Sequence, residues 1–467
     1  MTPCANRAID ELAQLVSWGD DLDEARTTYS ARDGKGNLAP PKTLQEIRKD
    51  DLSDGKTAIL AFFFGEKDSY LIVVTRDTLE IVGLETTRLQ IKSLIERVGS
   101  FIDASPVESA VILGKPYFNR AIADSLYTIL ISPVQKILAS MSRLLIVRGS
   151  DLGGLPFEML PFSRTLDAIS NKPHPNFLVE KFEISYRYAA GLPRVVKATS
   201  HQRFPFLFAI GSDVTARSAI SPIAASLLRS DSSKRPLHDV YPQINSELRW
   251  LRSEFGPSAL VLMDTEATKE RLLHFADASA VIHIASHSRI RGGARESGSI
   301  LLSSGDSNGL SDSLRVYDVL RMKTVAQLVV LSSCRTAMQP EFYSRTDYAK
   351  SFLIAGAASV LASLWDVDDA CTGKLMRSFY KHLRDGDRKS RALQAAKKEL
   401  IEDGVENPYY WASFILIGND DPINFPSDAA PKSLFSWTYQ SIVITFIALA
   451  LLFFGWSLPL KRRFRHR

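Results

Sequence analysis

Short apolar runs and amphipathic stretches alternate along most of the chain. Two β-branched and aromatic runs, AILAFFFG and YLIVVTRDTLEIVGL, flank the polar turn GEKDS, and this pattern predicts a β-hairpin. Apolar positions at helical spacing predict helices over 89–101 and 119–141, and the short buried strand RLLIVRG follows them. Upstream, the first 43 residues predict one short helix over 8–18 and a polar linker containing glycine and proline.

The pattern becomes more regular after residue 203. FPFLFAIGSD predicts a strand ending in a glycine turn, and a helix is expected over 242–254. The runs ALVLM, AVIHIAS, QLVVLSS and ASVLASLWD then predict strands, and ACTGKLMRSFYKHLRDG predicts a helix. Short apolar strands that alternate with helices are typical of a parallel sheet covered on both faces. We therefore predict an α/β sandwich with a mainly parallel central sheet, and no internal repeat indicates a solenoid.

One apolar run near the C-terminus has a different character. Residues 442–460 are uncharged and reach the roughly 20 residues needed to cross a bilayer. Trp437 and Tyr439 precede this run at the interfacial position, and the basic tail KRRFRHR follows it. The pattern predicts a C-terminal transmembrane helix, with a buried helix as the alternative. Because no signal peptide is recognisable, we expect a membrane protein with a single-pass C-terminal anchor and a cytoplasmic body.

Charge and cysteine content exclude several classes of protein. The chain has 57 Lys and Arg residues against 52 Asp and Glu residues, and five of the basic residues lie among the last seven positions. The rest is therefore neutral, which argues against a broad nucleic-acid surface. Three scattered cysteines suit neither a disulfide framework nor a zinc site, and we expect no metal and no cofactor.

Two of the predicted strands end in residues that suit nucleophilic chemistry. His287 and Ser288 follow AVIHIAS, and Cys334 follows QLVVLSS. The ends of adjacent parallel strands lie about 5 Å apart, so the imidazole could take the proton of the thiol. Backbone N–H groups of Ser288 and Cys334 are candidates for an oxyanion hole. From the residues alone, a core-packing role for Cys334 and a structural role for His287 stay open as alternatives.

Four motifs, in order, resemble the CHAT family of caspase-fold cysteine peptidases: VIHIASHS, VVLSSCRTA, FLIAGAASVLASLWDVDD and WASFILIGN. The segments RLLIVRG, LPFEML and LVEKFEISY fit the family's N-terminal half, so the resemblance covers about residues 44–424. It implies that His287 is the catalytic histidine, that Cys334 is the nucleophile and that His283 is structural. Ser288 replaces the glycine that normally follows the catalytic histidine, and a turn that needs a left-handed residue would lower activity there.

The resemblance also implies a caspase-like sandwich and a division of the chain. The expected parts are an N-terminal helix and linker (1–43), a pseudo-caspase-like N-terminal α/β half (44–200), a caspase-like peptidase half (201–424), a linker (425–441), the transmembrane helix (442–460) and a basic tail (461–467).

The segment LWDVDD is similar to that of separases, in which a carboxylate in this region receives a basic P1 side chain. By this resemblance Asp366 or Asp369 would bind the substrate. Alternatively, Asp368 or Asp369 caps the following helix, in which Cys371 packs. His283 and His287 also have the HxxxH spacing of a zinc-binding pair. Zinc peptidases have glutamate after the first histidine, on a helix, whereas this sequence has Ile284 on a predicted strand, so we expect no zinc site.

The resemblance favours a membrane-tethered cysteine endopeptidase with a Cys334–His287 dyad, acting on a protein substrate in signalling or defence. A tetratricopeptide-type regulatory partner is expected, and no nucleic acid. The alternative is a catalytically idle CHAT module that serves as a membrane-bound scaffold. Ser288, in place of the family's glycine, is the feature that suggests this alternative. A receptor body for a membrane-lytic partner is a third hypothesis, which the sequence does not separate from the first.

Overall fold

The chain divides into two compact units, Met1–Asn424 and Phe425–Arg467. The computed structural model describes residues 42–98, 118–166, 173–188, 205–212, 243–289, 299–304, 311–332, 348–365 and 369–426. All described helices and strands therefore lie in the first unit. The helix predicted over 8–18 and the predicted boundary near residue 200 fall outside the described residues.

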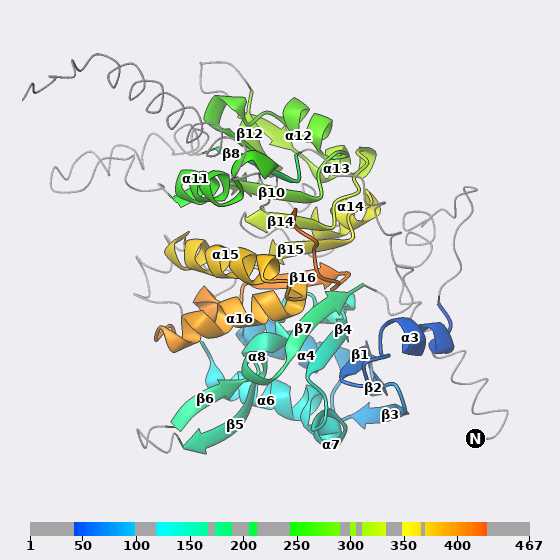
Figure 1. The fold of residues 1–467 in the computed structure, drawn as a ribbon. Coiled ribbons are helices and arrows are strands. Elements are labelled where there is room, and N and C mark those ends of the chain that lie inside the picture. Colours follow the sequence, from blue (N-terminus) through cyan, green and yellow to red (C-terminus); the bar gives the residue numbers. More distant parts are fainter. Residues whose placement is uncertain are drawn as a thin grey trace, which may run out of the picture. The chain divides into compact units, whose positions relative to one another are not determined.

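A sheet of eleven strands organises the first unit. Figure 1 shows this sheet with helices packed against it. Its order is β3-β2-β1-β4-β7-β16-β15-β14-β10-β8-β9, so neighbours in space are often distant in sequence. The strands are β1 (Thr57–Phe64), β2 (Ser69–Val74), β3 (Leu79–Leu84), β4 (Arg143–Val147), β7 (Glu183–Arg187), β8 (Leu207–Ser212), β9 (Ala259–Met263), β10 (Val281–Ser286), β14 (Leu328–Ser332), β15 (Ser359–Ser363) and β16 (Phe414–Gly418).

Strand directions confirm the predicted mixed α/β architecture with a large, mainly parallel sheet. β1, β2 and β3 form an antiparallel meander, which includes the predicted hairpin, and β1, β4 and β7 are parallel. On the other side, β9, β8, β10, β14 and β15 are all parallel. β16 joins the two sets, because it pairs antiparallel with β15 and contacts β7 through Ile417 and Tyr186.

Helices cover this sheet. Along one face, α11 packs on β8 and β9, α15 contacts both α11 and α16, and α16 packs on β7 (Figure 1). On the other side of the sheet, α14 packs on β15 (Figure 1). The described helices are α3 (Leu44–Asp50), α4 (Arg88–Val98), α6 (Arg120–Leu130), α7 (Gln135–Leu138), α8 (Leu178–Lys181), α11 (Gln243–Phe255), α12 (Lys269–Phe275), α13 (Val316–Arg321), α14 (Tyr348–Ile354), α15 (Asp369–Arg384) and α16 (Lys389–Glu402).

The single helix predicted over 119–141 is three pieces. α6 ends at Leu130, a 3₁₀ turn (η1, Ser132–Val134) follows, and α7 begins at Gln135. Pro133 explains the interruption, because proline lacks the N–H that a continuous helix would need.

Two small sheets complete the described fold. β11 (Ser288–Arg289), β12 (Ser299–Ser303) and β13 (Ser311–Leu314) form one of them directly after β10. β5 (Pro161–Leu166) and β6 (Pro173–Phe177) form the other. The short turn η3 (Phe157–Met159), which precedes β5, is fully buried.

The predicted membrane anchor needs correction. Among the residues that the structure describes, no helix is both long and apolar enough to span a bilayer. α15, the longest of them, has 16 residues and carries charged side chains, whereas a span needs about 20 apolar residues. This finding contradicts the expected single-pass C-terminal anchor and the membrane localisation based on it. Residues 442–460 themselves lie outside the described part of the chain.

Candidate active site

His287 follows β10 directly, at the carboxyl end of a strand whose six residues are all buried. Its backbone carbonyl accepts a hydrogen bond of 2.9 Å from the Leu301 N–H in β12, which fixes the chain just beyond the strand. The side chain is partly buried, and this burial lowers the pKa of His287 below its ordinary value. A neutral imidazole that can accept a proton is therefore favoured at neutral pH.

The predicted nucleophile follows the neighbouring strand. β10 and β14 are parallel neighbours, and Ala285 is in register with Ser332, the last residue of β14. His287 and Cys334 each come two residues after this pair in the sequence. Cys334 itself lies outside the described residues, so the structure describes the histidine side of the predicted dyad only.

Ser288 has an extended backbone in β11, opposite Ile300 of β12. Serine adopts this conformation without strain, so the described backbone does not demand the glycine that the family motif has at this position. The Leu301 N–H to His287 carbonyl bond makes Ser288 and Ile300 a non-hydrogen-bonded pair of the antiparallel ladder. In such a pair the N–H of Ser288 points away from β12.

His283 lies four residues before His287, inside the core. Its side chain is 0% exposed, Nδ1 lies 3.0 Å from the Tyr380 hydroxyl, and Nε2 lies 3.1 Å from Oε1 of Glu247. Both ring nitrogens thus contact buried polar groups of helices α15 and α11. These contacts suit the structural role expected for His283.

Glu247 was not identified from the sequence. Its Oε2 accepts a hydrogen bond of 3.1 Å from the Ser332 hydroxyl, so one carboxylate contacts both β10 and β14. The sequence does contain a signal for this role. Glu247 lies on the buried stripe of α11 together with Ile244, Leu248 and Leu251, and a carboxylate on an apolar helix face needs polar partners.

The two candidate substrate-binding carboxylates are barely described. Asp366 lies outside the described residues, and Asp369 is the first residue of α15, at which only the backbone is described. No group of three or more metal-ligating side chains occurs in the described ranges.

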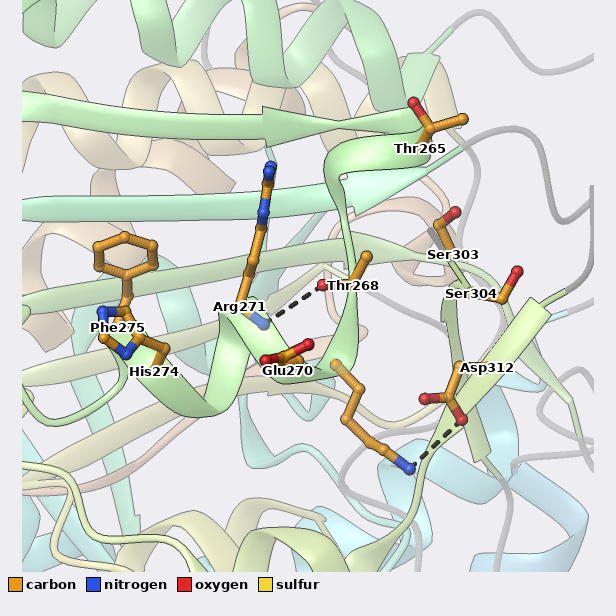
Figure 2. A pocket seen from close by; sticks show the side chains of 10 residues that line it. Thr265, Thr268, Glu270, Arg271, His274, Phe275, Ser303, Ser304 and Asp312 are labelled. Carbon is orange, nitrogen blue, oxygen red and sulfur yellow. Dashed lines mark hydrogen bonds and ion pairs between the residues drawn. The ribbon is translucent and has the colours of Figure 1, made fainter. Parts of the chain in front are cut away.

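A cavity of about 820 Å³ opens between α12 and the end of β12 (Figure 2). Lys269 and Arg271 of α12 line it together with Glu270 and Asp312, and Lys269 pairs with Asp312 at 3.3 Å. Two cations and two carboxylates leave this lining without a net preference for either sign of charge. The sequence did not predict the cavity, because its walls come from separate segments.

Comparison with known proteins gives matches of several kinds. A model of the CHAT domain matches residues 120–419. Tetratricopeptide repeat protein 28 of Homo sapiens is 34% identical over 123 residues, and that of Mus musculus is 33% identical over 123 residues. Each match covers 26% of this chain and 5% of the relative, so the chain spans a small part of their length.

Among solved structures, the chain is similar to separase in two crystal structures of the Saccharomyces cerevisiae separase–securin complex. One has a TM-score of 0.49 at 12% identity and covers 81% of this chain and 31% of that chain. The other has a TM-score of 0.43 at 11% identity, with 87% and 32% covered. The Arg-specific cysteine proteinase gingipain R gives a TM-score of 0.36 at 11% identity, with 71% and 74% covered. None of these three likenesses bears on the activity.

The family assignment depends on the domain model alone. Its match, over residues 120–419 of 467, spans well over half of the sequence and includes β4, β7, β10, β14, β15 and β16. His287 and Cys334 both lie within it. The chain therefore belongs to the CHAT domain family.

Proposed function

We propose that this chain is a cysteine endopeptidase in which Cys334 attacks a peptide carbonyl and His287 transfers the proton. The register of β10 and β14 carries the proposal, because Ala285 and Ser332 are paired and the two reactive residues follow at equal distances along parallel strands. Parallel strands lie about 5 Å apart, which suits a hydrogen bond between a thiol and an imidazole at their ends.

The proposed reaction uses His287 twice. As a neutral base, favoured by the lowered pKa, it takes the proton of the Cys334 thiol. The thiolate sulfur then bonds to the peptide carbonyl carbon, and the resulting oxyanion accepts hydrogen bonds from backbone N–H groups of Ser288 and Cys334. Imidazolium His287 protonates the leaving amine, and water hydrolyses the thioester to release the acid and regenerate the thiol.

Ser288 supports this arrangement through its backbone. Its N–H points away from β12 in the observed ladder, so strand pairing does not consume the donor that the oxyanion needs. We expect Ser288→Gly to leave the rate unchanged, since an extended residue gains nothing from glycine's freedom. A marked rise in activity on that substitution would instead favour the alternative function, a catalytically idle CHAT module that serves as a scaffold.

The substrate proposed is a protein with a basic P1 residue. Asp366 or Asp369 would bind its guanidinium or ammonium group, as the similarity of LWDVDD to separases implies. A tetratricopeptide-type partner is part of the proposal, and the name of the relatives, tetratricopeptide repeat protein 28, supports it. The partner would regulate access to the dyad.

A positional-scanning peptide library tests the activity directly. The full chain should hydrolyse peptides with Arg or Lys at P1, and Cys334→Ala should abolish turnover. His287→Ala should lower the rate by about 10²–10⁴-fold, the usual contribution of a general base. Cys371→Ala is the matched control, because Cys371 is a described cysteine in α15 and should be dispensable. Hydrolysis that survives both dyad substitutions would refute the proposal.

A further inference from the structure

Four buried polar side chains from four different elements form a connected series beneath the candidate site. Tyr380 of α15 lies 3.0 Å from His283 Nδ1 in β10, and His283 Nε2 lies 3.1 Å from Oε1 of Glu247 in α11. The second oxygen of Glu247 accepts the Ser332 hydroxyl of β14 at 3.1 Å. The side chains of these residues are 0% to 8% exposed.

Burying a carboxylate is costly unless polar partners replace its water, and the cost is greatest when the buried charge is left unpaired. The two oxygens of Glu247 divide their contacts between two strands, β10 through His283 and β14 through Ser332. The same two strands lead to His287 and Cys334. One helix side chain thus ties together the strands on which the proposed chemistry depends.

The positions of His283 and Ser332 along their strands explain what the contacts of Glu247 do. His283, Ala285 and Ser332 share one face of the sheet, since Ala285 is in register with Ser332 and side chains alternate with a period of two. The last described pair between β14 and β15 is Leu331 with Ala362. Ser332, the final residue of β14, pairs with Ala285 of β10, and its hydroxyl bond to Glu247 is a second attachment at this strand end.

We infer that Glu247 is a positioning residue of the proposed peptidase: it holds the ends of β10 and β14 in the register that brings His287 and Cys334 together. This inference rests on the proposed function. Glu247 acts through Ser332 and His283, and it needs no contact with the substrate. Tyr380 closes the series, and burial together with the charge of Glu247 raises its pKa well above the ordinary value, so its hydroxyl stays protonated.

The test compares kcat and KM of full-chain variants on the best library peptide. Glu247→Ala should lower kcat by about 100-fold with KM within about twofold, since a displacement near 1 Å can cost that much. Glu247→Gln should restore most of kcat, because an amide offers one acceptor and one donor to the same two partners. Ser332→Ala should lose part of kcat, and the double variant Glu247→Ala/Ser332→Ala should be no slower than Glu247→Ala.

Glu158→Ala is the matched control. Glu158 is also a buried carboxylate, 2% exposed, but its partners are Lys397 and Tyr186, away from β10 and β14. The substitution Glu158→Ala should lower the melting temperature of the protein and leave kcat unchanged. If Glu247→Ala fails to fold, Ser332→Ala, which removes one oxygen atom, decides the matter by the same comparison of kcat.

The outcomes separate the inference from the function. Equal kcat for wild type, Glu247→Ala and Ser332→Ala would overturn the positioning role and leave the peptidase standing. A wild type without thiol-dependent hydrolysis would refute the proposed function instead. In that case the ratio of the alkylation rates of Cys334 and Cys371 still reports on the surroundings of the Cys334 thiol. The same ratio in wild type and Glu247→Ala would overturn the inference.

Discussion

At the residue scale, burial of His287 sets the protonation state of its imidazole. Burial disfavours the charged form, and the pKa is therefore lowered. In the unfolded chain the same imidazole titrates near its ordinary value of about 6.5. Between that value and the lower folded pKa, the unfolded state binds more protons, so this residue's contribution to folding stability falls as the pH drops through that window.

An NMR titration of the His287 ring protons in the full chain, assigned with His287→Gln, should therefore give a midpoint below about 6.5. The acid limb of the peptidase pH profile should also lie below that value, because the base stays neutral at lower pH. A midpoint at or above it, or an acid limb that His287→Gln does not affect, would contradict this reading of the site.

Gly211 provides a second prediction at the same scale. It lies within β8, where the sequence indicated a turn, and a Cβ at this position would come within 1.8 Å of the Ala285 carbonyl oxygen in β10. Ala285 lies two residues before His287. The glycine is thus required by the close approach of two backbones, and not by a turn.

Gly211→Ala should cost about 1–3 kcal/mol of unfolding free energy, the usual range for overpacking, and it should slow hydrolysis by displacing the end of β10. Urea denaturation and peptide turnover measure the two effects. Gly83→Ala in the exposed strand β3, where a Cβ meets nothing within 4 Å, is the control and should be close to neutral. Equal effects of the two substitutions would contradict the account of Gly211.

At the element scale, a buried ion pair joins α16 to the turn η3. Lys397 Nζ lies 2.8 Å from Glu158 Oε1, and their side chains are 0% and 2% exposed. The Tyr186 hydroxyl donates to the other oxygen of Glu158 and accepts the Phe157 N–H at 2.8 Å. The segment LPFEML thus contributes a carboxylate that a helix from the other end of the chain neutralises.

Lys397→Met should cost about 3–5 kcal/mol of unfolding free energy, because it leaves Glu158 buried without its counterion. The double variant Lys397→Met/Glu158→Gln should recover much of the loss, since the neutral amide can still accept the Tyr186 hydroxyl. Urea denaturation measures both. Lys374→Met removes an exposed pair with Asp403, at 3.1 Å, and should cost about 0–1 kcal/mol; a similar cost for Lys397→Met would contradict the prediction.

Local patterns in the sequence predicted the strands well and the contacts between elements poorly. Continuous apolar runs identified β10, β14 and β15, and the rule that functional groups gather at strand ends selected His287 and Cys334. Pro133 divides a helix that its apolar periodicity predicted as one. Glu247 and its partners could not be predicted as a group, because 36 residues or more separate the glutamate from His283, Ser332 and Tyr380, and only the fold brings them together.

At the scale of the whole molecule, the described part of Met1–Asn424 is built on one continuous sheet. β16 and α16 come late in the sequence, yet β16 contacts β7, and α16 packs on β7 and α8. The side-chain amide of Gln394 in α16 donates a hydrogen bond of 2.8 Å to the Val179 carbonyl in α8. The N-terminal strands therefore depend on elements from the C-terminal half to cover them.

A fragment of residues 42–204 should consequently fail to fold alone. It would expose the edge of β7 and the apolar surface under α16, so we expect a weak near-UV circular dichroism signal and no cooperative urea transition. The fragment 42–426 is the control and should unfold cooperatively. A cooperative transition in the shorter fragment would show that the N-terminal half is an independent domain.

The central claim is that His287 activates Cys334. The most direct measurement is the rate of iodoacetamide alkylation at each cysteine of the full chain as a function of pH, followed by mass spectrometry, in wild type and His287→Ala. Cys334 should react faster than Cys371 near neutral pH, and His287→Ala should remove this advantage. Equal rates at the two cysteines, or a Cys334 rate that does not change when His287 is lost, would contradict the claim.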